Sequence, residues 1–256
     1  MFADVIYRLL GVIVLILVLS RLSDWIVVHL QGIGLLLSRS HQVATFFMFI
    51  VLAPGILFHE LSHWAMARLL GARTAGFRVW PRRTGRQKIQ LGAVQVRGAG
   101  RLSMALIGLA PFLVGTLALI FLGGWWQTPT AGMADWRAWL SPRGWERVGA
   151  FFAQGDWPWR FYALWVVANS MMPSAADREP VRPILIGVVL IAGVAYFVGL
   201  IPAIPPGVYQ ALIDLLDLLA AAFLLAVVGN VGVALLIGLF EYLLGLLLGT
   251  RVHYGG

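Results

Sequence analysis

The chain has 256 residues, of which 60% are hydrophobic and only 12% are charged, with a formal net charge of +8. Its mean hydropathy of +0.86 lies far above that of soluble globular domains, so the composition excludes an ordinary soluble enzyme and predicts an integral membrane protein. The absence of cysteine excludes a disulfide framework and a thiolate metal site, which leaves histidine, carboxylate and water as metal ligands.

Apolar segments long enough to cross a bilayer recur along the chain. A hydrocarbon core of roughly 30 Å requires about 20 helical residues. The first apolar run, residues 5–19, follows Asp4 and Arg8 and precedes no small-residue cleavage site, so we expect an uncleaved first span and not a signal peptide. The predicted spans cover residues 4–20, 43–70, 102–123, 159–173 and 183–202.

Two further apolar stretches extend the predicted fold. Residues 22–37 carry three polar side chains and either prolong the first helix or lie along the membrane interface. The stretch 208–249 is too long for one crossing and is interrupted by "GNVG" at 229–232, so it predicts two helices. The expected fold is therefore an all-α polytopic membrane protein with about six to seven transmembrane helices.

A basic loop follows the second predicted span. Residues 73–101 contain eight Lys and Arg residues and no acidic one, and the other 11 basic residues balance the 11 acidic residues of the chain. The positive-inside rule places such a loop in the cytoplasm, where it would also contact anionic lipid. A basic stretch can indicate nucleic-acid binding as well, but the aromatic residues here form no stacking platform, which disfavours that function.

The same loop and the segment after the third span carry two weaker signals. Alternating apolar and polar residues in "KIQL" (88–91) and "VQV" (94–96) predict short strands, broken by a bulge or turn at Gly92 and Ala93. We expect a small β-hairpin that caps the cytoplasmic side. Seven tryptophans between residues 125 and 159 predict an interfacial belt on the opposite face.

The motif "HELSH" (59–63) lies inside the second predicted span. On a helix, His59 and His63 project from one face, one turn apart, so both imidazoles can reach one ion at about 2.0 to 2.1 Å. In zinc peptidases the glutamate of H-E-x-x-H, here Glu60, is the general base and not a ligand. Ionisable groups at bilayer depth cost roughly 2.5 to 3.5 kcal/mol each, which favours a metal site over histidines satisfied by hydrogen bonds alone.

A catalytic zinc usually has three protein ligands, so one more must come from elsewhere in the chain. Asp177 is favoured by topology. The H-E-x-x-H helix ends at the basic loop, the next span runs outward and the following one returns, which brings "ANSMMPSAADREP" (168–180) to the same side and depth. Pro173 would break the returning helix and free carbonyl groups to line a cavity. The other candidates are His29, His41, His253, Asp214, Asp217 and Glu241.

With these two motifs, about residues 43–180 of the chain resemble the site-2 protease family of intramembrane zinc metalloproteases. Members pair H-E-x-x-H with N-x-x-P-x-x-x-x-D-G, whose aspartate is the third zinc ligand. Asn169 and Asp177 keep the family's separation of eight, whereas Pro173 stands one place later than in the family and Arg178 replaces the glycine. No PDZ-like or nucleotide-sensing domain fits the remaining length, so we expect a minimal member.

The resemblance implies Zn²⁺ held by His59, His63 and Asp177, and hydrolysis of peptide bonds of membrane-anchored proteins within or near the bilayer. Glu60 would take a proton from the attacking water and return it to the leaving amine. Asn169 would donate a hydrogen bond to the substrate backbone or to the oxyanion, with an interhelical hydrogen bond as its alternative role. The strands after the first motif would offer an edge to the substrate.

Two other functions stay open at this point. A catalytically silent homologue would bind or help to assemble another membrane protein, which the altered segment 169–177 would allow. A transport or proton pathway would use Asp214 and Asp217, which share a helical face, together with Glu241, although ion pairing or a place near the interface explains these carboxylates too.

The expected organisation has three parts. Residues 1–42 form N-terminal transmembrane or interfacial helices, residues 43–180 form the metalloprotease core, and residues 181–256 form C-terminal transmembrane helices. We expect a multi-pass protein of a prokaryotic cell membrane, with the basic loop and the active site toward the cytoplasm.

Overall fold

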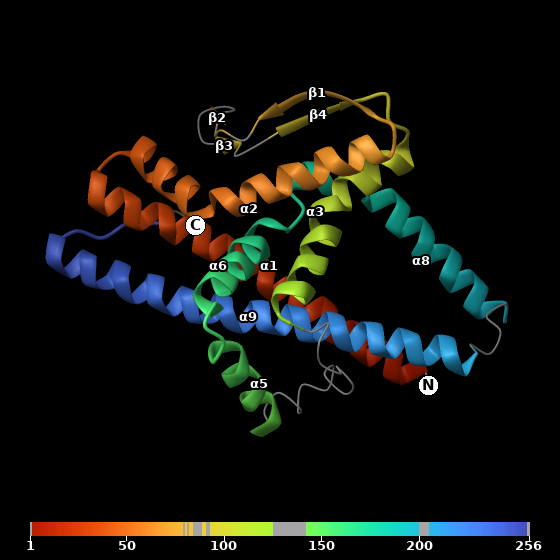
Figure 1. Ribbon diagram of the computed structural model, residues 1–256. Helices are drawn as coiled ribbons and strands as arrows, with labels where there is room; N and C mark the ends of the chain where they lie inside the picture. Colours follow the sequence, from red (N-terminus) through yellow and green to blue (C-terminus); the bar gives the residue numbers. More distant parts are fainter. Residues whose placement is uncertain are drawn as a thin grey trace.

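The computed structural model describes residues 2–78, 80, 82–83, 89–90, 93–124, 142–199 and 205–254. Within them the chain is mainly helical and also forms two small two-stranded sheets (Figure 1), which confirms a largely helical fold with a small β insertion. Four helices are long and apolar enough to cross a membrane: α1 (Phe2–Ser38), α2 (His41–Leu69), α3 (Arg101–Leu122) and α9 (Pro206–Leu248).

The remaining described helices are shorter. They are α5 (Pro142–Phe152), α6 (Trp157–Ser170), α7 (Ala175–Arg178) and α8 (Arg182–Phe197). At 1.5 Å per residue, α6 is about 21 Å long and α8 about 24 Å, less than the roughly 30 Å of a hydrocarbon core. The total of six to seven spans therefore stays a prediction, since four of the described helices have the required length.

The last apolar stretch forms one helix, so the prediction of two helices over 208–249 is wrong. α9 has 43 residues and runs without a break through Gly229 and Gly232. Each glycine costs a helix only about 1 kcal/mol, and no proline stops it here. Asn230, between the two glycines, is fully buried, and its side-chain Nδ2 donates to the carbonyl oxygen of Ala226 at 2.8 Å.

The first helix is also longer than one crossing, because residues 22–37 continue it through its 37 residues. α1 packs along α9 (Figure 1). Arg8 of α1 donates a hydrogen bond to the carboxylate of Asp217 on α9. Asp217 is only 2% exposed. The hydroxyl of Tyr209 donates to Asp4 at 3.0 Å, which adds a second polar link between the two helices. Ion pairing is thus the observed role of Asp217.

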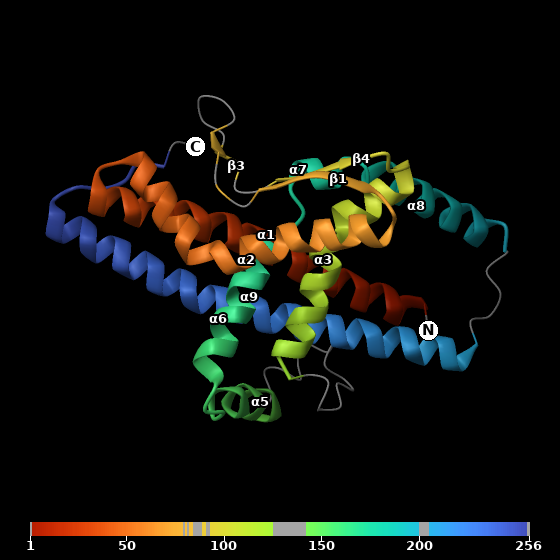
Figure 2. The ribbon, with the colours of Figure 1, turned by 45° about the horizontal axis from the view of Figure 1, so that its top comes forward.

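α2, which carries the H-E-x-x-H motif, packs against α3 and α6. Close approach of α2 to α6 depends on Gly55, because a Cβ atom there would lie 2.3 Å from the carbonyl oxygen of Val166. α3 and α6 cross α1 and α9, and run between the strands at the top of Figure 2 and α5 at its bottom. The motif therefore lies near the strand side of the bundle.

The strands follow α2 directly. β1 (Arg73–Arg78) pairs antiparallel with β4 (Ala93–Arg97), and β2 (Arg82–Arg83) pairs antiparallel with β3 (Ile89–Gln90). This confirms a small β insertion with strands at the two predicted places, but these strands pair with the earlier segments β2 and β1 and not with each other. The register shifts between Thr74 and Gly76 of β1. The predicted irregularity involves Gly92, which lies outside the described residues.

The predicted tryptophan belt falls partly outside the described residues, because 125–141 are not among them. Trp145 of α5 and Trp157 and Trp159 of α6 are exposed. Figure 2 shows α5 at the end of the molecule opposite to the strands. These three side chains thus lie on the side where the belt was expected.

Candidate metal centre

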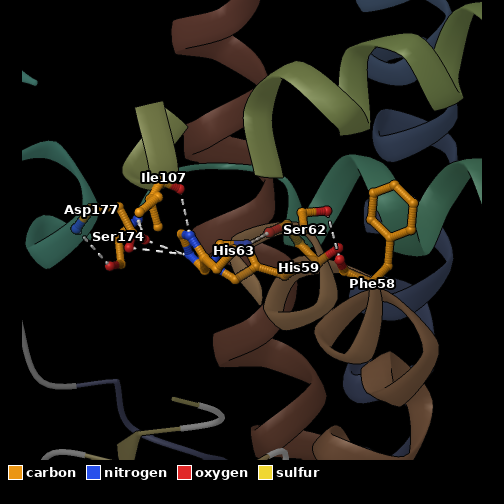
Figure 3. Close-up of polar contacts among 8 residues, drawn as sticks. Phe58, His59, Ser62, His63, Ile107, Ser174 and Asp177 are labelled. Atoms are coloured by element: carbon orange, nitrogen blue, oxygen red, sulfur yellow. Dashed lines mark hydrogen bonds and ion pairs between the residues drawn. The ribbon is translucent and has the colours of Figure 1, made fainter. Parts of the chain in front are cut away.

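The structure brings together the three residues that the two motifs predict as ligands. His59 and His63 project from α2 toward Asp177 on α7 (Figure 3). The two Nε2 atoms are 3.1 Å apart. His63 Nε2 lies 3.2 Å from Asp177 Oδ1, and His59 Nε2 lies 3.7 Å from Asp177 Oδ2. Among the described residues, this is the one group of three such side chains whose ligand atoms all lie within 4.8 Å of one another.

These separations fit a zinc ion. Bonds of 2.0 to 2.1 Å in a tetrahedron give ligand atoms about 3.3 to 3.4 Å apart. The observed distances between the candidate ligand atoms, 3.1, 3.2 and 3.7 Å, lie on both sides of that value. Two imidazoles and one carboxylate form a donor set typical of catalytic zinc, which keeps a fourth position open.

The hydrogen bonds of the two rings define which nitrogens face the site. His59 Nδ1–H donates to the carbonyl oxygen of Ser170 at 2.6 Å, and His63 Nδ1–H donates to that of Ile107 at 2.7 Å. Because a carbonyl oxygen only accepts, each Nδ1 carries the hydrogen, and in a neutral ring Nε2 then has a lone pair. Two lone pairs 3.1 Å apart beside a carboxylate repel one another unless a proton or cation lies among them.

Local structure holds Asp177 in place. α6 ends at Ser170, three residues before Pro173, and the short helix α7 begins after Ser174. Ser174 and Asp177 form a capping box, in which Asp177 N–H donates to Ser174 Oγ at 3.3 Å and Ser174 N–H donates to Asp177 Oδ2 at 2.8 Å. This pair orients the carboxylate toward the histidines.

Asp177 is ionised in this setting. Burial by itself raises the pKa of the carboxyl group, but the hydrogen bonds that His59 and His63 donate when their Nε2 atoms are protonated, together with that of Ser174, outweigh burial and hold the pKa well below its usual range. The lowered pKa favours the charged carboxylate, the form that binds a metal ion.

Close packing of α3 against α7 completes the site. A Cβ atom at Gly108 would lie 2.3 Å from the backbone oxygen of Asp177, so only glycine permits this approach. Its neighbour Ile107 provides the carbonyl oxygen for His63. One turn of α3 thus contacts two of the three candidate ligands. The sequence signal for Gly108 is weak, because the chain contains 29 glycines.

Gly108→Ala is expected to weaken zinc binding by at least about 10-fold, since the added methyl group pushes the Asp177 backbone away and supporting contacts of this kind typically contribute 10- to 100-fold in metal affinity. Zinc competition with a chromophoric chelator measures the effect. Gly193→Ala is the matched control, because a Cβ atom on this α8 glycine meets nothing within 4 Å. Equal affinity of Gly108→Ala and the unchanged protein would contradict the role of this contact.

Glu60 lies beside the candidate ligands and is not one of the three. Its side chain belongs to the buried polar residues, with a residue exposure of 7%. It interacts electrostatically with Asp177, and with His59 and His63 when these rings are protonated. Glu60 is therefore a buried carboxyl group close enough to the three candidate ligands to interact with them electrostatically.

Asn169 makes the interhelical hydrogen bond that was its alternative role. Its Nδ2 donates to the carbonyl oxygen of Trp165 and to Oδ1 of Asn230 on α9, both at 2.7 Å. Both amide hydrogens are therefore used within the protein, and its Oδ1 is buried without a partner among the described residues. The prediction that Asn169 contacts substrate stays a prediction. Asn230 was missed, although an asparagine within an apolar stretch is itself a signal for a polar contact.

The other candidate ligands have different surroundings. Glu241 accepts a hydrogen bond from the Tyr254 hydroxyl at 2.5 Å and lies 4.0 Å from His29 Nε2, whose ring stacks on Trp25. Exposed Asp214 accepts from Gln210 at 2.9 Å. None of these side chains, nor His41, His253 or Asp217, belongs to the described group of three.

No protein-family model, curated protein or solved structure matches this chain. The resemblance to site-2 proteases therefore depends on the two motifs, and the functional inference depends on the geometry of the centre.

Proposed function

We propose that this chain is an intramembrane zinc metalloprotease of the site-2 protease type, which hydrolyses peptide bonds of membrane-anchored proteins within or near the bilayer. The observation that supports it best is the convergence of two Nε2 lone pairs from the apolar helix α2 with the carboxylate of Asp177 from α7, together with the buried Glu60 of α2. Buried polar groups of this kind in a membrane helix point to a functional site.

Each residue of the centre has a separate role in the proposed reaction. His59 and His63 offer neutral nitrogen ligands, and Asp177 adds one negative charge that offsets part of the charge of Zn²⁺. When bound, the ion would act as a Lewis acid and lower the pKa of water from 15.7 toward about 7. Glu60 takes the proton of the attacking water onto its carboxylate and returns it to the leaving amine, so that one water adds across the peptide bond.

The environment of α2 supports a membrane-anchored substrate. Leu57, Leu61 and Trp64 recur at helical spacing and are 41%, 43% and 39% exposed, so this face of α2 suits contact with lipid. The histidines lie on the inner face, against α3 and α6. A peptide that reaches them must enter the apolar layer, and a helical one must unwind first because its backbone carbonyls are otherwise hydrogen-bonded. The basic strands after α2 favour a cytoplasmic orientation of the site.

A second candidate is a catalytically silent homologue that binds or helps to assemble another membrane protein. The observation that favours it is Asn169, whose two amide hydrogens are already used by Trp165 and Asn230. Such a protein would keep the metal centre as a structural element and cleave nothing.

Zinc content and proteolysis together test the proposal. We expect about one zinc per chain in protein purified without chelator. Reconstituted into liposomes with a panel of single-span proteins tagged at both ends, it should cleave at least one within or near its span, with the site identified by the mass of the products. Chelator should suppress cleavage and added zinc should restore it. Full zinc content without any cleavage would favour the silent homologue, and absence of any transition metal would refute the metalloprotease.

A further inference from the structure

α3 carries a proline at its centre, in a segment that would otherwise form a regular apolar helix. Pro111 is fully buried within α3, and a proline has no backbone N–H. In an α-helix the N–H of residue 111 would donate to the carbonyl oxygen of residue 107. The carbonyl of Ile107 thus lacks the donor that every other residue type at position 111 would offer.

That carbonyl is the one that accepts from His63. The distance from His63 Nδ1 to Ile107 O is 2.7 Å, and His63 is buried. A carbonyl without its helical donor in an apolar layer needs another one, and a side chain of a neighbouring helix commonly provides it. The proline of α3 therefore leaves open the carbonyl oxygen to which the second histidine of the H-E-x-x-H motif donates its hydrogen bond.

The second histidine follows the same pattern at a helix end. His59 Nδ1–H donates to Ser170 O at 2.6 Å, in the last turn of α6. The next residues cannot close that turn in the usual way, because residue 173 is a proline and the N–H of Ser174 donates to Asp177 Oδ2. Both histidines are thus held by carbonyl oxygens that the backbone leaves open next to a proline.

We propose that Pro111 is a positioning residue of the metal centre: by withholding an N–H from Ile107 O, it reserves this carbonyl for His63 Nδ1–H and so presents the Nε2 lone pair of His63 to the ion. This inference deepens the proposed function and rests on it for the identity of the ion. A hydrogen bond of this kind selects the tautomer and the ring orientation of a metal-binding histidine.

The first test measures zinc affinity. Pro111→Ala provides a new N–H that competes with His63 for Ile107 O, and we expect a 10- to 100-fold weaker zinc affinity by competition with a chromophoric chelator. Thr116→Val is the matched control in the same helix, since it removes only the hydrogen bond from Thr116 Oγ1 to Phe112 O. Affinity of Pro111→Ala within about 3-fold of the unchanged protein, or an equal loss in Thr116→Val, would overturn the proposal.

The second test needs no metal and is read on the unchanged protein. Nitrogen NMR of ¹⁵N-histidine-labelled, metal-free protein, with the His63 signal assigned by its loss in His63→Gln and recorded where the ring is neutral, should show the hydrogen on Nδ1. Dominance of the Nε2–H tautomer in the unchanged protein would overturn the proposal. If the protein binds no zinc but His63 carries Nδ1–H, the metalloprotease fails while the hydrogen bond from His63 to Ile107 O stands.

Discussion

Asp177→Ala is expected to lower zinc affinity by more than about 100-fold, beyond the 10- to 100-fold typical of supporting groups, because it removes one of three protein ligands. It also leaves the Nε2 atoms of His59 and His63 3.1 Å apart without the Asp177 carboxylate that lies next to them. Zinc per chain by mass spectrometry, together with chelator competition, measures the change.

Asp214→Ala is the control for that experiment, because Asp214 is an exposed carboxylate on α9. Its zinc affinity should equal that of the unchanged protein. If Asp177 were a surface carboxylate in an ion pair, its loss would change stability by only about 0 to 1 kcal/mol and leave zinc in place. A zinc-loaded structure with the Asp177 carboxylate more than about 4 Å from the ion, well beyond a bond of 2.0 to 2.2 Å, would also refute the assignment.

Glu60→Gln is expected to abolish most proteolysis while zinc content and folding stay unchanged. The amide has the size of the carboxyl group but cannot accept the proton of water at neutral pH, and removal of a general base typically costs 10²- to 10⁴-fold in rate. The measurement is the initial rate of product formation from a tagged single-span substrate in liposomes, with zinc determined on the same samples.

Glu241→Gln makes the same chemical change at the Tyr254 contact on α9, so cleavage should proceed at the rate of the unchanged protein. Loss of zinc in Glu60→Gln would instead show that Glu60 holds the centre together. Equal cleavage by Glu60→Gln and the unchanged chain would remove Glu60 from the mechanism.

Local periodicity explains what the sequence alone determined. Apolar runs near 20 residues predicted helices at α2 and α3, and alternation predicted strands after α2. The spacing of His59 and His63 placed both rings on one helical face before any tertiary contact was known. Asp177 needed one further step, the count of crossings between the two motifs. These features depend on neighbours in sequence or on the direction of the chain.

Tertiary structure decided the features that depend on which helices touch. The continuity of α9 through Gly229 could not be read locally, because buried Asn230 is satisfied by Ala226 O in its own helix and by Asn169 of α6. The acceptors of the histidine rings are backbone oxygens, which every residue has, so no residue type marks Ile107 in advance. Close approach at Gly108 depends on how α3 is rotated against α7. Hydropathy is insensitive to that rotation, whereas hydrogen bonds and contacts change over a few tenths of an ångström.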